Sequence, residues 1–412
     1  MTGLRSYGLV TAAYWGFTLT DGALRMLVVL HFQRLGYDPV SIAFLFLFYE
    51  FFGIVTNLLG GWIASRSGVK VTLYGGLVVQ IVALVMLAVL NPHWPKLLSV
   101  SYVMVAQALS GIAKDLTKMS AKTAIRALVP VEAEEGKLFR WVSRLTGSKN
   151  ALKGVGFFVG GALLQTLGYT SALMAMAAGL LVVLLCTAAA LPAGIARSRK
   201  QAKFTALFSK SPAINWLSAA RVFLFASRDV WFVVALPVFL SRLGWTAPSV
   251  GAFLAIWVIG YGVIQTMVPE ILRLAGWSTV DASVSRVWIF LLAGVPAVLS
   301  VAVRAGGNPA LVLMVGLAVF GVIFAVNSAL HSYLVLAYSS EDSLALDVGF
   351  YYMANAGGRL MGTLASGFVF LAAGFAGCLW ASSVLVLVAG LLSLGLPDQR
   401  PVAVGRAEAG SE

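Results

Sequence analysis

Long apolar runs alternate with short polar turns along the whole chain. Twelve such runs can be read, each about 20 residues or more, which is the length a helix needs to cross the hydrocarbon core of a bilayer. Each run should be helical, because unpaired backbone groups are too costly in lipid. The predicted spans are residues 7–33, 39–65, 71–90, 97–121, 138–166, 168–191, 213–240, 247–274, 283–303, 309–336, 345–372 and 375–396.

Composition agrees with a multi-pass membrane protein. Of the 412 residues, 60% are hydrophobic and 11% are charged, against about 25% charged residues in ordinary soluble domains. The net charge of +13 does not indicate a nucleic-acid partner, because no basic stretch belongs to a soluble module that could present it to phosphates.

Cys186 and Cys378 lie far apart in apolar runs and form no disulfide or metal motif. We expect neither a cofactor nor a metal site.

One long polar connection divides the chain into six spans and six. It carries five basic residues, whereas the other connections are short. Lys and Arg in the short loops concentrate on the same side as this connection, which the positive-inside rule assigns to the cytoplasm together with both termini. We therefore predict an N-terminal six-helix bundle (1–191), a basic cytoplasmic linker (192–212), a C-terminal six-helix bundle (213–396) and a disordered cytoplasmic tail (397–412).

The two halves repeat each other in sequence. Arg34–Tyr37, which follows the first span, matches Arg242–Trp245 after the seventh at an offset of 208 residues. At the same offset Asp21 falls on Asp229. An internal repeat of this kind indicates two structurally similar halves, as in many transporters.

A second repeat signal links the fifth and eleventh spans. Near an offset of 206 residues, Lys153 aligns with Arg359 and several glycines coincide, so a cation in one half occupies the position of a cation in the other. Two six-helix halves in parallel repeat, joined by a basic loop, resemble the plan of major facilitator superfamily transporters. The resemblance implies an all-α membrane protein of twelve transmembrane helices in two pseudo-symmetric bundles.

The spans contain charged residues well away from their ends. Each cation at the centre of a lipid-facing helix costs about 2.5 to 3.5 kcal/mol, so these residues should face water or one another. The eight cations are Arg25, Lys114, Lys118, Lys149, Lys153, Arg221, Arg228 and Arg359, and the four acids are Asp21, Glu50, Asp115 and Asp229. For Arg221 and Lys118, which lie nearer the cytoplasmic ends, snorkelling to the interface is an equal alternative.

Spacing favours a shared cavity. Lys114 and Lys118 form one stripe on the fourth span, and Lys149 and Lys153 form one on the fifth. Arg25 lies four residues after Asp21 and can pair with it. After the four acids are paired, about four positive charges remain, and surplus cations in an enclosed space attract a multiply charged anion. Arg and Lys together suit phosphate, arsenate or carboxylate oxygens.

The acids allow a second interpretation. Asp21 and Asp229 occupy equivalent places, where a carboxylate could take up a proton in one conformation and pair with Arg25 or Arg228 in the other. Asp115 and Glu50 are weaker candidates for this role. The alternative is that these carboxylates form permanent ion pairs.

Several blocks carry a closer resemblance than the superfamily plan. They are YWGFTLTDGALRMLVVLHFQRLGY (14–37), LSGIAKDLTKMSAK (109–122), LTGSKNALKGVGFF (145–158) and FSKSPAINWLSAARVFLFASRDVWFVVALPVF (208–239). The chain is similar here to the organoarsenical efflux permeases of bacterial arsenic resistance, the ArsJ family. This resemblance implies a monomer in the bacterial inner membrane that exports 1-arseno-3-phosphoglycerate by alternating access and so gives arsenate resistance. It also implies a functional link to the glyceraldehyde-3-phosphate dehydrogenase that makes this ester.

From the charge pattern we predict a substrate-binding set of cations contributed by both halves. Its members are Arg25, Lys114, Lys118, Lys149, Lys153, Arg228 and Arg359, while Asp21, Asp229 and Asp115 are assigned to proton coupling or ion pairing. Export of trivalent arsenic is disfavoured, because it requires thiolates and both cysteines lie in spans predicted to stand away from the centre.

Two other classes of function remain as alternatives. An antiporter of organic phosphates against inorganic phosphate would use the same cations. A membrane enzyme is disfavoured, because no His, Cys or paired carboxylates form a nucleophile or metal site at a span end. A scaffold or sensor would have no use for eight interior cations.

Overall fold

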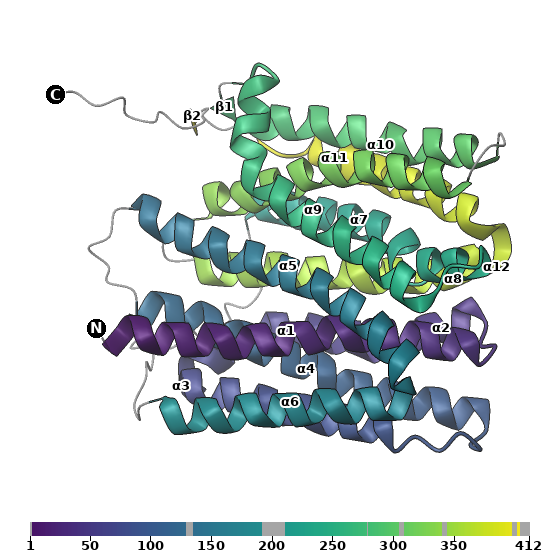
Figure 1. The fold of residues 1–412 in the computed structure, drawn as a ribbon. Coiled ribbons are helices and arrows are strands. Elements are labelled where there is room, and N and C mark those ends of the chain that lie inside the picture. Colours follow the sequence, from purple (N-terminus) through teal and green to yellow (C-terminus); the bar gives the residue numbers. More distant parts are fainter. Residues whose placement is uncertain are drawn as a thin grey trace.

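The protein is an elongated bundle of long helices (Figure 1). The structure is a computed structural model that describes residues 2–128, 135–191, 211–277, 279–304, 309–339, 344–397 and 402–403. Of the predicted linker 192–212, only Ser211 and Pro212 are among the described residues, and most of the tail after Pro397 also lies outside them.

Helices account for nearly all of the described chain. In the N-terminal half they are α1 (Thr2–Arg34), α2 (Pro39–Phe44), α3 (Leu47–Ala88), α4 (Lys96–Leu128), α5 (Glu135–Thr166) and α6 (Gly168–Ala190). In the C-terminal half they are α7 (Pro212–Phe232), α8 (Ala235–Arg242), α9 (Ala247–Leu274), α10 (Ala282–Arg304), α11 (Pro309–Tyr338) and α12 (Leu344–Ser393). The two-residue strands β1 (Thr279–Val280) and β2 (Val402–Ala403) pair antiparallel.

The twelve predicted spans are confirmed, although the helices are divided differently. α3 has 42 residues and would be about 63 Å long if straight, roughly twice the hydrocarbon thickness. It contains the second part of span two and nearly all of span three. α12 likewise contains spans eleven and twelve, which meet at Gly374, where φ is 64°. Only a residue without a β-carbon adopts this conformation readily.

Two spans are interrupted where the sequence predicts continuous helices. The second span breaks between α2 and α3, and the seventh breaks between α7 and α8. At the second break the backbone N–H of Ala235 donates to the Ser366 hydroxyl of α12 at 3.0 Å. A side chain from another helix thus satisfies a donor that an unbroken helix would have used.

Within the described chain, nine helical stretches are long and apolar enough to cross a membrane. α1 and α5 are not among them. Their interiors carry Asp21 and Arg25 in α1 and Lys149 and Lys153 in α5. Interior charges of this kind lower the hydropathy of a helix, which agrees with the absence of α1 and α5 from this set.

The repeat seen in the sequence is present in the backbone. Gly36 and Gly244 both have positive φ, at 80° and 86°. Two residues later, Asp38 and Thr246 each cap the following helix by accepting the backbone N–H three positions on. The same turn therefore connects the first and second spans in each half.

Glycines allow the helices of each half to approach closely. A β-carbon on Gly156 of α5 would collide with the Leu19 carbonyl of α1, and one on Gly362 of α12 would collide with the Ala226 carbonyl of α7. Gly161 of α5 lies equally close to α9. These glycines form packing seams, both within and between the halves.

The halves meet mainly along three helix pairs. α5 packs against α9, and α12 packs against α2 and α3. Figure 1 shows α5 and the first part of α12 in the middle of the bundle, with the last part of α12 beside α10 and with α6 and α10 toward opposite outer sides. The parts of α2, α3, α5, α9 and α12 that make these contacts therefore lie at the interface between the halves.

Candidate functional site

A buried carboxylate on α3 joins cations from both halves. Glu50 Oε1 accepts a hydrogen bond from Arg25 of α1 at 2.8 Å and one from Arg359 of α12 at 2.6 Å. Its side chain is fully buried. The contact between Arg359 and Glu50 is an ion pair across the interface between the two halves.

The repeat-related acids pair with the repeat-related cations. Asp229 of α7 lies 3.5 Å from Arg359 Nε and also contacts its neighbour Arg228. In the N-terminal half, Asp21 of α1 lies 4.0 Å from Lys153 Nζ. The two offsets found in the sequence thus identify equivalent ion pairs.

Asp21 does not pair with Arg25 as expected. The Tyr49 hydroxyl donates to Asp21 at 2.6 Å, while Arg25 reaches Glu50. The prediction rested on spacing along one helix, and the packed structure offers Arg25 a carboxylate on the neighbouring helix instead. Asp21 is consequently left to Tyr49 and Lys153.

The fourth acid belongs to a separate network on α3 and α4. Asp115 accepts hydrogen bonds from Lys118 at 2.8 Å, from Thr56 at 2.6 Å and from Asn57 at 3.3 Å. Lys118 also donates to Asn57. Three donors to one carboxylate, one of them charged, are what a permanent ion pair would have.

Lys114 lies between these groups without a close acid. Its Nζ sits 4.1 Å from the centroid of the Tyr49 ring, a cation–π arrangement. Among the described residues no carboxylate is within ion-pair distance of it. Lys149, one turn before Lys153 on α5, is half-buried.

Arg221 is a buried cation of the C-terminal half that the predicted set leaves out. Its side chain donates to Asn355 at 3.0 Å, to the Ser328 carbonyl at 3.4 Å and to the Ser328 hydroxyl at 3.3 Å. Arg221 is 4% exposed, so it does not snorkel to the interface. Lys118 is likewise held by partners inside the bundle.

Four of the cations are more accessible than the acids. The side chains of Lys118, Lys153, Arg228 and Arg359 are 15%, 20%, 16% and 15% exposed. By contrast, the side chains of Glu50, Asp115 and Asp229 are fully buried, and that of Asp21 is 6% exposed. Since these cations contact residues inside the bundle, the surface they leave open belongs to its interior, and that surface is positive.

The structure brings most of the predicted set together. Arg25, Arg359 and Arg228 are linked through Glu50 and Asp229. Lys153 pairs with Asp21, and Tyr49 connects this pair to Arg25. Lys114 is joined to this group through Tyr49. Lys118 belongs to the Asp115 network. Among the described residues, the charges expected inside the spans are eight cations and four carboxylates, and Asp347 near the start of α12 is a further buried acid.

The sequence prediction missed the role of Glu50. A signal for it exists, because Glu50 stands in an apolar run with no basic residue within one turn. An acid in such a place requires a partner from another helix. The sequence does not say which helix supplies that partner.

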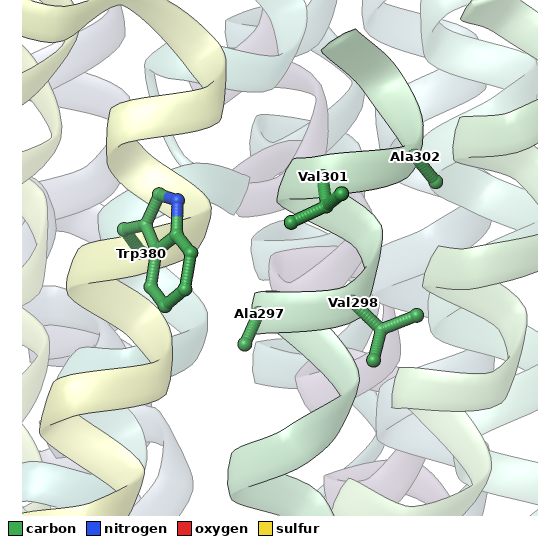
Figure 2. Close-up of a pocket in the computed structure, with 5 residues that line it drawn as sticks. All are labelled: Ala297, Val298, Val301, Ala302 and Trp380. Carbon is green, nitrogen blue, oxygen red and sulfur yellow. The ribbon is translucent and has the colours of Figure 1, made fainter. Parts of the chain in front are cut away.

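Hollows on the outer surface lie away from these charges. One is lined by Ala297, Val298, Val301 and Ala302 of α10 and by Trp380 of α12 (Figure 2). A second, apolar hollow lies between α10 and α11. Exposed apolar side chains of this kind suit contact with lipid tails, and neither hollow offers a charged group to a solute.

Comparison with known proteins identifies the family. The model of the Major Facilitator Superfamily matches residues 10–280 of the chain. The chain belongs to the major facilitator superfamily. This membership makes it a multi-pass membrane transporter with two six-helix bundles, as the fold indicates. No curated protein matches the chain significantly.

Solved structures of other superfamily members have the same fold. A POT family transporter in complex with 5-aminolevulinic acid aligns with a TM-score of 0.75 at 14% identity, over 95% of both chains. A POT family transporter in complex with a thioalcohol conjugated peptide aligns with a TM-score of 0.72 at 15% identity, also over 95% of both chains. At this identity the similarity concerns the fold alone.

Proposed function

We propose that this transporter carries an organic anion with several negative charges, and that the anion is 1-arseno-3-phosphoglycerate, exported from the bacterial cytoplasm. The observation that carries the proposal is the positive interior surface at the interface between the halves. There Lys153, Arg228 and Arg359 are partly accessible and the carboxylates lie behind them. A solute bound at this surface would offset charge that the acids leave uncompensated.

The chemistry of the cations fits oxyanions. Arg228 and Arg359 present planar guanidinium groups that can bind two oxygens of one tetrahedral group, and Lys153 adds a point charge from the other half. A phosphate and an arsenate ester at the two ends of a short carbon body would use cations from both halves. The arsenical itself rests on the resemblance of the charged blocks to the organoarsenical permeases.

Alternating access follows from the ion pair between the halves. Arg359 contacts Glu50 in the N-terminal half and Asp229 in its own half. An anion at Arg359 would compete with Glu50 and loosen the link, so solute binding would change the energy of moving one half against the other. Coupling to a proton through Asp21, Asp229 or Asp115 remains a prediction.

Export can be tested in liposomes that contain purified protein. The dehydrogenase, its aldehyde substrate, the nicotinamide cofactor and arsenate are enclosed, and arsenic appearing outside is measured over time. The proposal expects arsenic release that requires both the dehydrogenase and its substrate, and that is lost in Arg359→Gln. Release that occurs without the dehydrogenase, or not at all, would contradict it.

The same cations would also serve an antiporter of phosphoglycerate and inorganic phosphate. A second set of liposomes, loaded with phosphate and supplied with labelled 3-phosphoglycerate outside, separates the two. Rapid counterflow without arsenate-dependent release would favour the antiporter. Arsenate-dependent release without counterflow would favour the exporter.

A further inference from the structure

Arg221 lies in a polar group of its own within the C-terminal half. Its guanidinium is held by neutral acceptors on α11 and α12, Ser328 and Asn355. Tyr261 of α9 donates to the same Ser328 hydroxyl at 3.0 Å. Three helices besides α7 therefore fix this charge in place.

The charge of Arg221 has no carboxylate within ion-pair distance among the residues that the structure describes. A buried charge without a counter-ion is costly, and neutral acceptors orient the guanidinium without cancelling its charge. Nearby, His331 is fully buried, and neither ring nitrogen has a hydrogen-bond partner in the described part of the chain. The group thus contains an uncompensated cation and an unused ring donor.

This group is continuous with the central site. Arg221 and Arg228 are two turns apart on α7, and both guanidinium groups lie over the Phe225 ring, at 4.0 and 4.9 Å from its centroid. On α12, Asn355 precedes Arg359 by one turn. Seven residues of helix rise about 10 Å, so two layers of positive charge are stacked along the axis of the bundle.

The N-terminal half also reaches the second layer. The Arg221 guanidinium lies 4.9 Å from the Tyr351 ring centroid, and Tyr351 contacts Tyr352 edge to face. Lys118 Nζ lies 5.4 Å from the centroid of the Tyr352 ring. A pair of aromatic rings therefore stands between a cation of α4 and a cation of α7.

We infer that Arg221 forms a second anion subsite, which binds one oxyanion end of a solute whose other end lies at Arg228 and Arg359. The ligand class is a phosphate, arsenate or carboxylate group on a short carbon body, with Asn355 and Ser328 holding the guanidinium and His331 available as a donor. The inference rests on the proposed anion transport. It adds that the site distinguishes anions with two charged ends from those with one.

The test compares two probes on the purified full-length protein. 3-Phosphoglycerate has a phosphate and a carboxylate end, whereas inorganic phosphate is a single group. Arg221→Gln should weaken binding of 3-phosphoglycerate about tenfold or more, because a charged hydrogen bond to the solute is lost. The affinity for phosphate should stay within about twofold of the wild-type value. The control variant Arg242→Gln removes an exposed cation of α8 and should change neither the affinity for 3-phosphoglycerate nor that for phosphate.

A more conservative variant covers the case in which Arg221→Gln does not fold. Arg221→Lys keeps the charge but loses the planar fork, and should weaken 3-phosphoglycerate binding about threefold with phosphate unchanged. If the wild type binds both anions and the Arg221 variants weaken both equally or neither, the subsite is wrong and the proposed transport stands. If the wild type binds neither anion, both proposals fail.

Discussion

The two repeat-related ion pairs of this transporter have the same position and different chemistry. In the N-terminal half Lys153 lies 4.0 Å from Asp21, and in the C-terminal half Arg359 lies 3.5 Å from Asp229. Arg359 additionally reaches Glu50 across the interface. A guanidinium offers several donors in one plane, whereas an ammonium is a single point, so only the C-terminal cation connects both halves.

This difference assigns separate roles to equivalent positions. Lys153 contributes charge to the interior surface of its own half. Arg359 contributes charge and also links the halves, so its loss should affect both binding and the movement between conformations. The asymmetry arises from one Lys-to-Arg difference in an otherwise similar backbone, which makes it accessible to single substitutions.

The largest effect is expected from Arg359→Gln. It removes the cation that joins Glu50 to Asp229 and leaves each carboxylate with only one cation, Arg25 or Arg228, so we expect anion transport to fall about a hundredfold or more. Initial rates of 3-phosphoglycerate uptake in liposomes measure this, with Arg242→Gln as the matched loss of an arginine. Transport within threefold of the wild type would remove Arg359 from the site.

Glu50→Gln should separate binding from turnover. Without this carboxylate, the solute no longer competes for Arg25 and Arg359, so anion affinity should rise several-fold while the rate of transport falls. Binding to detergent-solubilised protein and transport in liposomes give the two quantities. Weaker binding with unchanged transport would show that Glu50 supports the site and does not compete with the solute.

Exchanging the two cations tests the asymmetry directly. Arg359→Lys should lower transport about tenfold, because an ammonium cannot contact both acids, whereas Lys153→Arg should lower it only a few-fold. The same uptake assay applies to both variants, with their amounts in the membrane matched. Equal losses would mean that the halves use their cations alike.

The repeat-related caps should affect stability and leave transport intact. Asp38→Ala and Thr246→Ala should each lower the free energy of unfolding by about 0.5 to 2 kcal/mol, measured by thermal melting in detergent. Partial burial raises the pKa of Asp38, but hydrogen bonds from Lys96 and Ser41 outweigh it and bring the pKa well below the usual range.

A lowered pKa in the folded state gives the sign of the pH effect. The stabilisation from Asp38 is complete above the pKa of an unfolded aspartate, about 3.9, and is lost as the pH falls below that value. The contribution of the Thr246 cap should not change over this range. If the loss of melting temperature changes equally for Asp38→Ala and Thr246→Ala between pH 7 and pH 3, the pH-dependent role of the Asp38 carboxylate is wrong.

The smallest effect is expected at the outer hollow of Figure 2. Trp380 is 45% exposed and Val298 is 70% exposed, and the hollow they line contains no charged group. Trp380→Ala should therefore leave anion affinity and transport within about twofold. A large loss of affinity for 3-phosphoglycerate would move the site away from the interior.

Patterns along single helices could be predicted from the sequence. The apolar runs, the turn after the first span of each half, and the equivalence of Lys153 with Arg359 follow from composition and spacing. The surplus of interior cations also follows, because charges in apolar runs can be counted without knowing where they point.

Contacts between helices could not be predicted in this way. The partner of Arg25 is Glu50 on α3, 25 residues away, and not Asp21 one turn away. Arg221 is fixed by residues more than 100 positions distant. The break between α7 and α8 likewise depends on Ser366. These features depend on which helices pack together, information that periodicity does not contain.

The central claim is that cations from both halves bind one anion inside the bundle. Arsenic can be located by its anomalous X-ray scattering, so crystals of the protein soaked in arsenate test the claim directly. We predict an arsenic peak close enough to Arg228 or Arg359 for the arsenate oxygens to accept their hydrogen bonds, and near Lys153. Arsenic found only on the outside of the bundle, or no peak at saturating arsenate, would contradict it.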